Sequence, residues 1–237
     1  PAINKINKFP KKEKIITFVG KLNHSKGYDT FGKAIIRILK KYKDWKSIVI
    51  GDEEREKLVF THPSLHVMGF VEHNKVIKLF EKSSIAVVPS RWEEPLGRTG
   101  LEASSRGCAT IVSNRGGLPE TVTDGVILKK LNEKELYKNI QFLINNKKFR
   151  TTLQRNSINN FKLDHSTISR KIDKVRRKIL KTFSFNIDKK SKLKIIHITN
   201  FNFRYHGRLH YNTGTRLNNG LIRLGHNVLS LSDRDLI

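Results

Sequence analysis

The segment Ile15-Ile16-Thr17-Phe18-Val19-Gly20 is a short apolar run that ends at a glycine. Its β-branched and aromatic residues do not alternate with polar ones, which is typical of a strand buried on both faces of a sheet. Apolar residues at helical spacing follow over 28–42, and a second apolar run occupies Ser47–Ile50. This order of strand, helix and strand predicts two parallel strands joined by a crossover helix.

The same alternation continues for another eighty residues. A helix is expected around Val76–Phe80, ending near Ser83-Ser84, and another over Leu101–Arg106, with Gly107 as its left-handed terminator. Further strands are predicted at Leu65–Met68, Ile85–Val88, Ala109–Ser113 and Gly125–Leu128. The pattern predicts a Rossmann-like α/β fold, a doubly wound parallel sheet covered by helices on both faces. Ligands of such sheets bind at the carboxyl ends of the strands.

The remainder of the chain divides into a helical segment and a second alternating segment. Helices are predicted at Glu133–Asn145, Lys147–Phe161 and Thr167–Lys181, and residues 186–193 resemble a basic linker. A strand at Lys194–Ile198, a loop through Gly207, a helix at Tyr211–Leu224 and a strand at Val228–Leu231 then predict one βαβ unit. One such unit cannot bury both faces of its sheet, so we expect 194–237 to be the truncated start of another domain.

The chain is strongly basic. Its 237 residues include 47 Lys and Arg against 21 Asp and Glu, a net charge of 47 − 21 = +26. Nucleic acids and anionic membranes both attract such surfaces, but lysine-rich coding bias explains the count equally well. The charge is accompanied by no RNP-like aromatic motif and no zinc-finger spacing, so it does not by itself predict a specific nucleic-acid partner.

Three absences in the sequence bear on its compartment. Cys108 is the single cysteine, which fits a reducing environment, and it cannot form an intrachain disulfide or a cysteine zinc site. No apolar run approaches the roughly 18 residues of a spanning helix. No apolar signal core stands at the N-terminus. We therefore expect a cytoplasmic protein.

The stretch 89–103, Pro-Ser-Arg-Trp-Glu-Glu-Pro-Leu-Gly-Arg-Thr-Gly-Leu-Glu-Ala, contains a pair of acidic residues at a characteristic spacing. Glu94 and Glu102 are separated by seven residues, and Pro95 suits the first turn of a helix. Glu102 would then lie about two turns into that helix. Its N-terminus would present backbone N–H groups to an anion. Those groups belong to Leu96, Gly97, Arg98 and Thr99. Taken alone, such a pair is more often a capping acid and a surface residue.

Three other loops follow predicted strands. The loop 20–27, Gly-Lys-Leu-Asn-His-Ser-Lys-Gly, carries Lys21 and Lys26, whose charges would neutralise a diphosphate unless they are ordinary surface lysines. It matches neither the Walker motif nor the dinucleotide G-x-G-x-x-G motif. Gly116-Gly117 follows the predicted strand Ala109–Ser113, and these glycines form either a plain tight turn or part of a binding site. The stretch 68–71, Met-Gly-Phe-Val, closes a short strand where backbone groups could face a base.

Taken together, the order and spacing of these four motifs resemble the nucleotide-sugar-binding domain of retaining glycosyltransferases with the GT-B fold, of the group 1 or family 4 type. The resemblance covers 10–185, and 1–9 is similar to the linker that precedes this domain. Residues 194–237, ending in Gly225-His226-Asn227-Val228, are similar to the start of an N-terminal acceptor-binding domain, with a generic Rossmann-like start as the alternative. The order suggests a fragment of a tandem of two transferases.

The resemblance implies a role for each motif. Lys21 and Lys26 would bind the diphosphate, Glu102 the ribose hydroxyls, and Glu94 would face the donor sugar and the reacting centre. Glu93 is an alternative to Glu94 but lacks the seven-residue gap. The remaining substrate-binding positions are Gly20, the backbone of Leu96, Gly97, Arg98 and Thr99, and Phe70 and Val71 beside the base. The family needs no metal and no cofactor beyond the nucleotide diphosphate sugar that serves as donor.

The function implied by the resemblance is sugar transfer to a hydroxyl with retention of configuration. The acceptor would be a bacterial surface glycan such as lipopolysaccharide, or its lipid-linked precursor. The basic surface would contact the anionic inner face of the membrane peripherally. The chain alone, lacking most of an acceptor domain, is expected to bind donor weakly without turnover. Two other functions stay open: a non-catalytic nucleotide-sugar-binding module, and a basic nucleic-acid-binding protein.

Overall fold

The computed structural model describes residue 6 and residues 8–182, 192–199 and 213–232. The chain divides into two compact units, Pro1–Val175 and Arg176–Ile237. Most of the predicted linkers 1–9 and 186–193, and the loop through Gly207, lie outside the described residues. The predicted domain boundaries therefore stay predictions.

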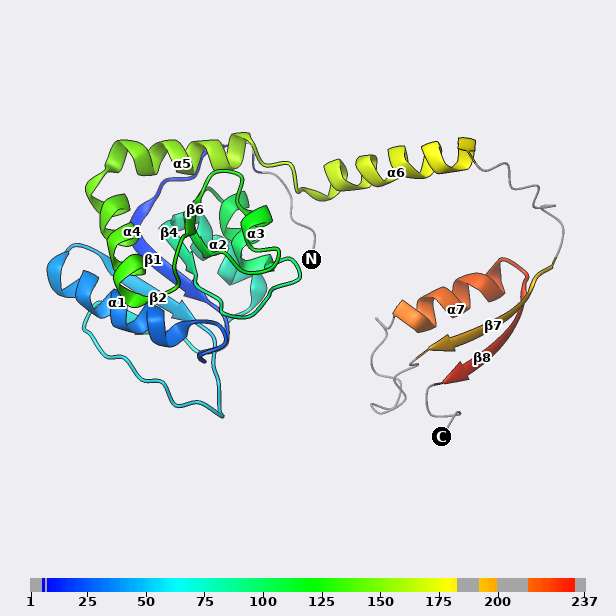
Figure 1. Ribbon diagram of the computed structural model, residues 1–237, viewed down its shortest axis with the longest axis horizontal. Helices are drawn as coiled ribbons and strands as arrows, with labels where there is room; N and C mark the ends of the chain where they lie inside the picture. Colours follow the sequence, from blue (N-terminus) through cyan, green and yellow to red (C-terminus); the bar gives the residue numbers. More distant parts are fainter. Residues whose placement is uncertain (1–5, 7, 183–191, 200–212, 233–237) are drawn as a thin grey trace. The chain divides into compact units, whose positions relative to one another are not determined.

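The first unit contains a six-stranded parallel sheet with the order β3-β2-β1-β4-β5-β6 (Figure 1). Its strands are β1 (Glu13–Val19), β2 (Lys46–Ile50), β3 (Leu65–Val67), β4 (Ser83–Val88), β5 (Ala109–Ser113) and β6 (Val126–Leu128). The predicted Rossmann-like, doubly wound fold is confirmed. The strand order reverses between β1 and β4, and in open sheets of this type the crevice outside the carboxyl ends at that point binds ligands.

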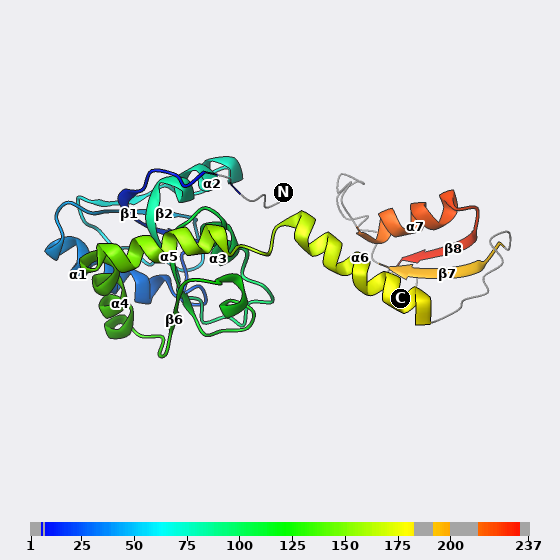
Figure 2. The ribbon, with the colours of Figure 1, turned by 90° about the horizontal axis from the view of Figure 1, so that it is seen from above.

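Helices cover both faces of this sheet because alternate strand residues point to opposite sides. On one face Phe18 of β1 packs with the apolar stripes of α1 (Tyr28–Lys41) and α4 (Glu133–Asn145). On the other, Ala86 of β4 packs with α2 (His73–Lys82) and α3 (Arg98–Ser105). Figure 2 shows α1 and α2 on opposite sides of the strands. The helix α5 (Lys147–Asn159) and the short 3-10 helix η1 (Pro119–Thr121) also belong to this unit.

The C-terminal ends of α2 and α3 both lie where the sequence predicts them. Gly107 has φ 72°, and the N–H of Cys108 donates to the carbonyl of Ala103 at 3.1 Å, so the predicted left-handed terminator is confirmed. The helix α2 ends at Lys82 with Ser83 as its C-cap, so the predicted end near Ser83-Ser84 is confirmed. The next strand, β4, begins at Ser83, two residues before the predicted start at Ile85. Both hydroxyls are buried and partnered: Ser83 Oγ lies 2.5 Å from Thr17 Oγ, and Ser84 donates to a carbonyl of β1. Satisfied hydroxyls are tolerated inside a strand.

The helix α6 (His165–Thr182) follows α5. Asp164 caps its N-terminus by accepting hydrogen bonds from the Ser166 hydroxyl at 2.7 Å and the Thr167 N–H at 3.0 Å. These bonds hold the pKa of Asp164 well below its usual range. The boundary between the two compact units falls within this helix.

In the second unit, β7 (Lys194–Thr199) and β8 (Asn227–Ser232) form a parallel pair connected through α7 (Thr213–Arg223). This agrees with the predicted βαβ unit, although the first two residues of the predicted helix lie outside the described residues. Asn218 of α7 is buried against the pair, where its Oδ1 accepts from the Ser230 hydroxyl at 2.7 Å. None of the helices described here is long and apolar enough to cross a membrane.

Candidate active site

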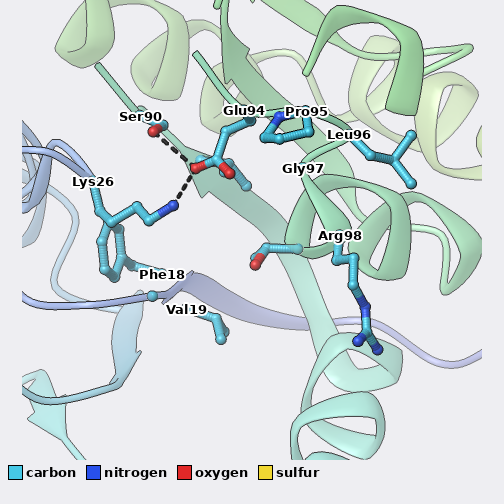
Figure 3. Close-up of a pocket in the computed structure, with 12 residues that line it drawn as sticks. Phe18, Val19, Lys26, Ser90, Glu94, Pro95, Leu96, Gly97 and Arg98 are labelled. Carbon is cyan, nitrogen blue, oxygen red and sulfur yellow. Dashed lines mark hydrogen bonds and ion pairs between the residues drawn. The ribbon is translucent and has the colours of Figure 1, made fainter. Parts of the chain in front are cut away.

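A cavity of about 370 Å³ lies at the carboxyl ends of β1 and β4, where the strand order reverses (Figure 3). The loop 20–27 after β1, the loop 89–97 after β4 and the start of α3 form its walls. Its lining residues are Phe18, Val19, Gly20, Lys26, Val88, Ser90, Glu94, Pro95, Leu96, Gly97, Arg98 and Thr99. The motif loops that the sequence separates by about seventy residues therefore meet in one site.

Glu94 is the acidic residue of the cavity, and two side chains converge on it (Figure 3). Lys26 forms an ion pair with Glu94 Oε1, and the Ser90 hydroxyl donates to the same oxygen at 3.0 Å. The side chains of Lys26 and Glu94 are 31% and 15% exposed. A cation and an anion thus face one water-accessible space, where each retains strong electrostatic influence on a ligand.

The two loops approach closely because Gly27 has no side chain. Gly27 has φ 73°, and a Cβ there would stand 1.8 Å from the carbonyl oxygen of Pro89. The carbonyl of Ser25 also accepts from the N–H of Arg91 at 2.8 Å. The backbones themselves therefore set the separation between Lys26 and the loop that carries Glu94.

Arg91 and Asp29 join the loop after β4 to α1 by their side chains. The guanidinium of Arg91 donates from Nη1 to Asp29 Oδ1 at 2.6 Å and from Nη2 to Oδ2 at 2.9 Å. Burial would raise the pKa of Asp29, but the hydrogen bonds and charge of Arg91 outweigh it and hold that pKa below its usual range. This bidentate pair fixes the loop after β4 to the start of α1.

The Gly116-Gly117 turn holds the backbone of the Glu94 loop. The Gly117 N–H donates to the Glu94 carbonyl at 2.6 Å, and a Cβ on Gly116 would meet that oxygen at 2.4 Å. The Gly116 N–H and Arg115 both bond the carboxylate of Glu93, at 2.5 and 3.0 Å. The neighbouring acids thus separate: Glu93 binds the turn, and Glu94 enters the cavity.

The start of α3 differs from the sequence expectation. The helix begins at Arg98 with Gly97 as N-cap at φ 74°, so Pro95 and Leu96 lie in the preceding loop. Gly117 explains the difference, because its bond to the Glu94 carbonyl holds that loop out of helical geometry. Glu102 consequently lies a little more than one turn into α3, not two. Leu96, Gly97, Arg98 and Thr99 still line the cavity at the helix N-terminus, as expected.

Four of the expected binding residues lie outside the cavity lining: Lys21, Phe70, Val71 and Glu102. Lys21 is exposed in the loop after β1, and Phe70 is 82% exposed after β3. Glu102 is buried beside the cavity, where its Oε1 bonds His73 Nε2 at 3.0 Å and Arg98 Nη2 at 3.1 Å. Gly20, Lys26 and Glu94 are brought together as expected.

Sequence reasoning missed several lining residues. The missed residues include Phe18 and Val19, the last two residues of β1, and Val88, the last residue of β4. Ser90, two residues beyond the end of β4, also lines the cavity and bonds Glu94. A signal existed, since strand ends at a reversal of strand order approach a ligand. Within the described residues no group of three or more His, Cys, Asp or Glu is placed to hold a metal ion.

The family "Glycosyl transferases group 1" matches residues 1–160, which is the sheet and its covering helices through α5. Spore coat protein SA of Bacillus subtilis is 33% identical over 129 residues, covering 48% of this chain and 33% of that protein. The chain therefore spans about a third of the length of that curated relative.

Solved structures show the same fold. The C-terminal domain of LpcC, a glycosyl transferase group 1 family protein from Francisella tularensis, is 25% identical with a TM-score of 0.56, covering 64% of this chain and 85% of that one. HepE of Anabaena, solved in complex with UDP-glucose, is 17% identical with a TM-score of 0.58, covering 72% of this chain and 49% of that one. Since the family match covers more than half of the residues, this chain belongs to the glycosyl transferases group 1, with the C-terminal domain of the GT-B fold.

Proposed function

We propose that this chain is the donor-binding part of a retaining glycosyltransferase that moves a sugar from a nucleotide diphosphate sugar to a hydroxyl. The observation that carries the proposal is the placement of Glu94 in the cavity at the β1/β4 switch point, with Lys26 opposite it and the N-terminus of α3 beside it. A helix N-terminus and a lysine suit a diphosphate, and an acid suits a sugar that develops positive charge.

In the proposed reaction the bond between the anomeric carbon and the diphosphate breaks, and the acceptor oxygen bonds to that carbon on the same face. The acceptor proton leaves with the nucleoside diphosphate. Lys26 and the backbone N–H groups at the start of α3 stabilise the charge on the departing diphosphate. Glu94 stabilises the positively charged sugar ring, a role that needs its carboxylate ionised.

The identities of the partners are finer parts of the proposal. UDP-glucose is bound by HepE, a protein with the same fold, which supports a nucleotide sugar as the donor class. A bacterial surface glycan or its lipid-linked precursor is proposed as the acceptor, on the resemblance to lipopolysaccharide sugar transferases. The net charge of +26 would favour peripheral contact with the anionic inner face of a membrane, and hence a cytoplasmic location.

Thermal unfolding in the presence of UDP, GDP and ADP tests donor binding directly. A nucleotide that binds only the folded chain raises Tm by mass action, and the largest rise identifies the preferred base. No rise with any of the three would contradict the proposal.

Release of sugar from the matching donor by the full-length protein then tests chemistry. Glu94→Ala should abolish that release while nucleotide binding persists. Binding without any Glu94-dependent release would favour the alternative, a non-catalytic nucleotide-sugar-binding module.

A further inference from the structure

Glu102, to which the resemblance to retaining glycosyltransferases assigns the donor ribose, is held on one side only. It is 6% exposed on α3, and its Oε1 accepts two hydrogen bonds, from His73 Nε2 at 3.0 Å and from Arg98 Nη2 at 3.1 Å. Glu102 Oε2 has no hydrogen-bond partner among the described residues but is not fully buried, so it keeps contact with solvent.

The two donors hold Glu102 differently. Arg98 stands one turn before Glu102 on the same helix, and its side chain is 57% exposed, so it can follow the carboxylate as that side chain rotates. His73 is the first residue of α2, a separate helix, and its side chain is 35% exposed. A bond from a second element fixes the rotation of the Glu102 side chain relative to the rest of the fold.

We propose that His73 is a positioning residue for the ribose of the donor. By holding Oε1 it leaves Oε2 directed outward, where it can accept a hydrogen bond from a ribose hydroxyl. For this bond the imidazole carries a proton on Nε2, either as the neutral tautomer or as the cation. Without His73, Glu102 loses a fixed orientation, so a ribose hydroxyl must order the carboxylate on binding. The inference rests on the proposed function and adds His73 as a residue that supports binding of the donor.

The experiment compares a ribonucleotide with its 2′-deoxy form. Affinities of the preferred nucleoside diphosphate and of its 2′-deoxy counterpart are measured for the full chain by calorimetry. The wild type should prefer the ribonucleotide, and Glu102→Ala should lose that preference. His73→Ala should reduce the preference by about 3- to 10-fold, as expected for one hydrogen bond. It should leave the affinity for the deoxynucleotide unchanged within about twofold, since the deoxynucleotide lacks the hydroxyl in question.

Two further variants separate positioning from folding. His73→Gln keeps an N–H donor at the end of the side chain and should restore much of the preference. His66→Ala, an exposed histidine on β3, removes the same group from a place with no contact to Glu102 and should change neither affinity. Equal losses of both nucleotides in His73→Ala would show a merely structural role and overturn the proposal.

The remaining outcomes distinguish this inference from the function beneath it. If Glu102→Ala loses the preference and His73→Ala keeps it, the role of His73 is wrong while donor binding stands. If Glu102→Ala keeps the preference, the assignment of Glu102 to the ribose is wrong, and the role of His73 falls with it. If the wild type binds no nucleoside diphosphate, both the proposed function and this inference are overturned.

Discussion

Glu94 and Glu102 are both largely buried acids near the start of α3, but different kinds of structure hold them. Glu94 stands on a loop, and its partners Lys26 and Ser90 stand on loops beyond β1 and β4. Glu102 stands on a helix, and its partners Arg98 and His73 are the first residues of α3 and α2.

This difference determines what each carboxylate depends on. The Glu94 loop is placed by backbone contacts so close that Gly27 and Gly116 admit no side chain. Glu102 is placed by hydrogen bonds between side chains of regular elements. Adding a side chain to a glycine of these loops should therefore disturb the region around Glu94. Replacing a single polar side chain should disturb the region around Glu102.

The largest effect should follow removal of charge from Glu94. Glu94→Gln keeps the size of the side chain but removes the anion that we propose faces the donor sugar. We expect kcat for sugar transfer by the full-length protein to fall by about 100- to 1000-fold, the usual loss when one electrostatic contact to the transition state is removed. Glu93→Gln is the matched control, because Glu93 bonds the Gly116 turn outside the cavity. Comparable losses in the two variants would show that the cavity does not distinguish the neighbouring acids.

A methyl group at Gly27 should test the dependence on close backbone approach. Gly27→Ala adds a clash with the Pro89 carbonyl to the strain of φ 73°, and we expect it to lower the free energy of unfolding by about 2–3 kcal/mol. Gly69→Ala carries a similar strain at φ 64° but meets no atom within 4 Å, so its loss should be about 1 kcal/mol. Urea denaturation measures the free energy of unfolding of both variants. Equal decreases would mean that the two loops can move apart at Gly27 without loss of stability.

The next largest effect should distinguish the two lysines of the loop after β1, Lys21 and Lys26, by their contributions to nucleotide affinity. Lys26→Met removes the cation that pairs with Glu94 in the cavity, and we expect nucleoside diphosphate affinity to fall by about 10- to 100-fold, as for the loss of a charged hydrogen bond. Lys21→Met removes the same charge from an exposed position outside the cavity lining, so its effect should be smaller. Titration calorimetry measures the two. A larger loss with Lys21→Met would place the diphosphate farther along the loop than the cavity indicates.

The sequence predicted the elements of the sheet because burial on both faces leaves a local mark. The apolar run at Ile15–Val19 and the helical spacing over 28–42 are properties of adjacent residues, and the structure has β1 and α1 there. Gly107 was predictable for the same reason, since a left-handed residue after a helix favours glycine wherever the rest of the chain lies.

The parts that the sequence did not predict depend on contacts between distant residues. The strand predicted from Ile85 begins at Ser83 instead, where Thr17 of the neighbouring strand supplies the buried Ser83 hydroxyl with a partner. Pro95 predicts the first turn of α3, but the bond from the Gly117 N–H to the Glu94 carbonyl keeps Pro95 in the loop before the helix. His73 carries no motif at all, because only the fold brings it to Glu102.

The smallest effect should be a pH-dependent one at the Arg91–Asp29 pair, which joins the loop after β4 to the start of α1. Because Arg91 lowers the pKa of folded Asp29, the pair stabilises the fold at every pH above the unfolded value of about 3.9 and loses that contribution as pH falls toward the folded value. Asp29→Asn should thus be about 1 kcal/mol less stable than the wild type at pH 7 and pH 5. The gap should narrow below about pH 4, where the wild-type carboxylate takes up its proton.

Urea denaturation at pH 7, 5 and 3.5 measures that gap. Asp52→Asn is the control, since Asp52 is exposed and forms no ion pair with any described residue, and it should change stability little at each pH. A gap for Asp29→Asn that persists undiminished at pH 3.5 would mean that the charge of Asp29 is not what holds the loop after β4 to α1. The approach of Lys26 to Glu94 would then depend on the backbone contacts at Gly27 alone, and the loop-built region would be still more distinct from the side-chain cluster around Glu102.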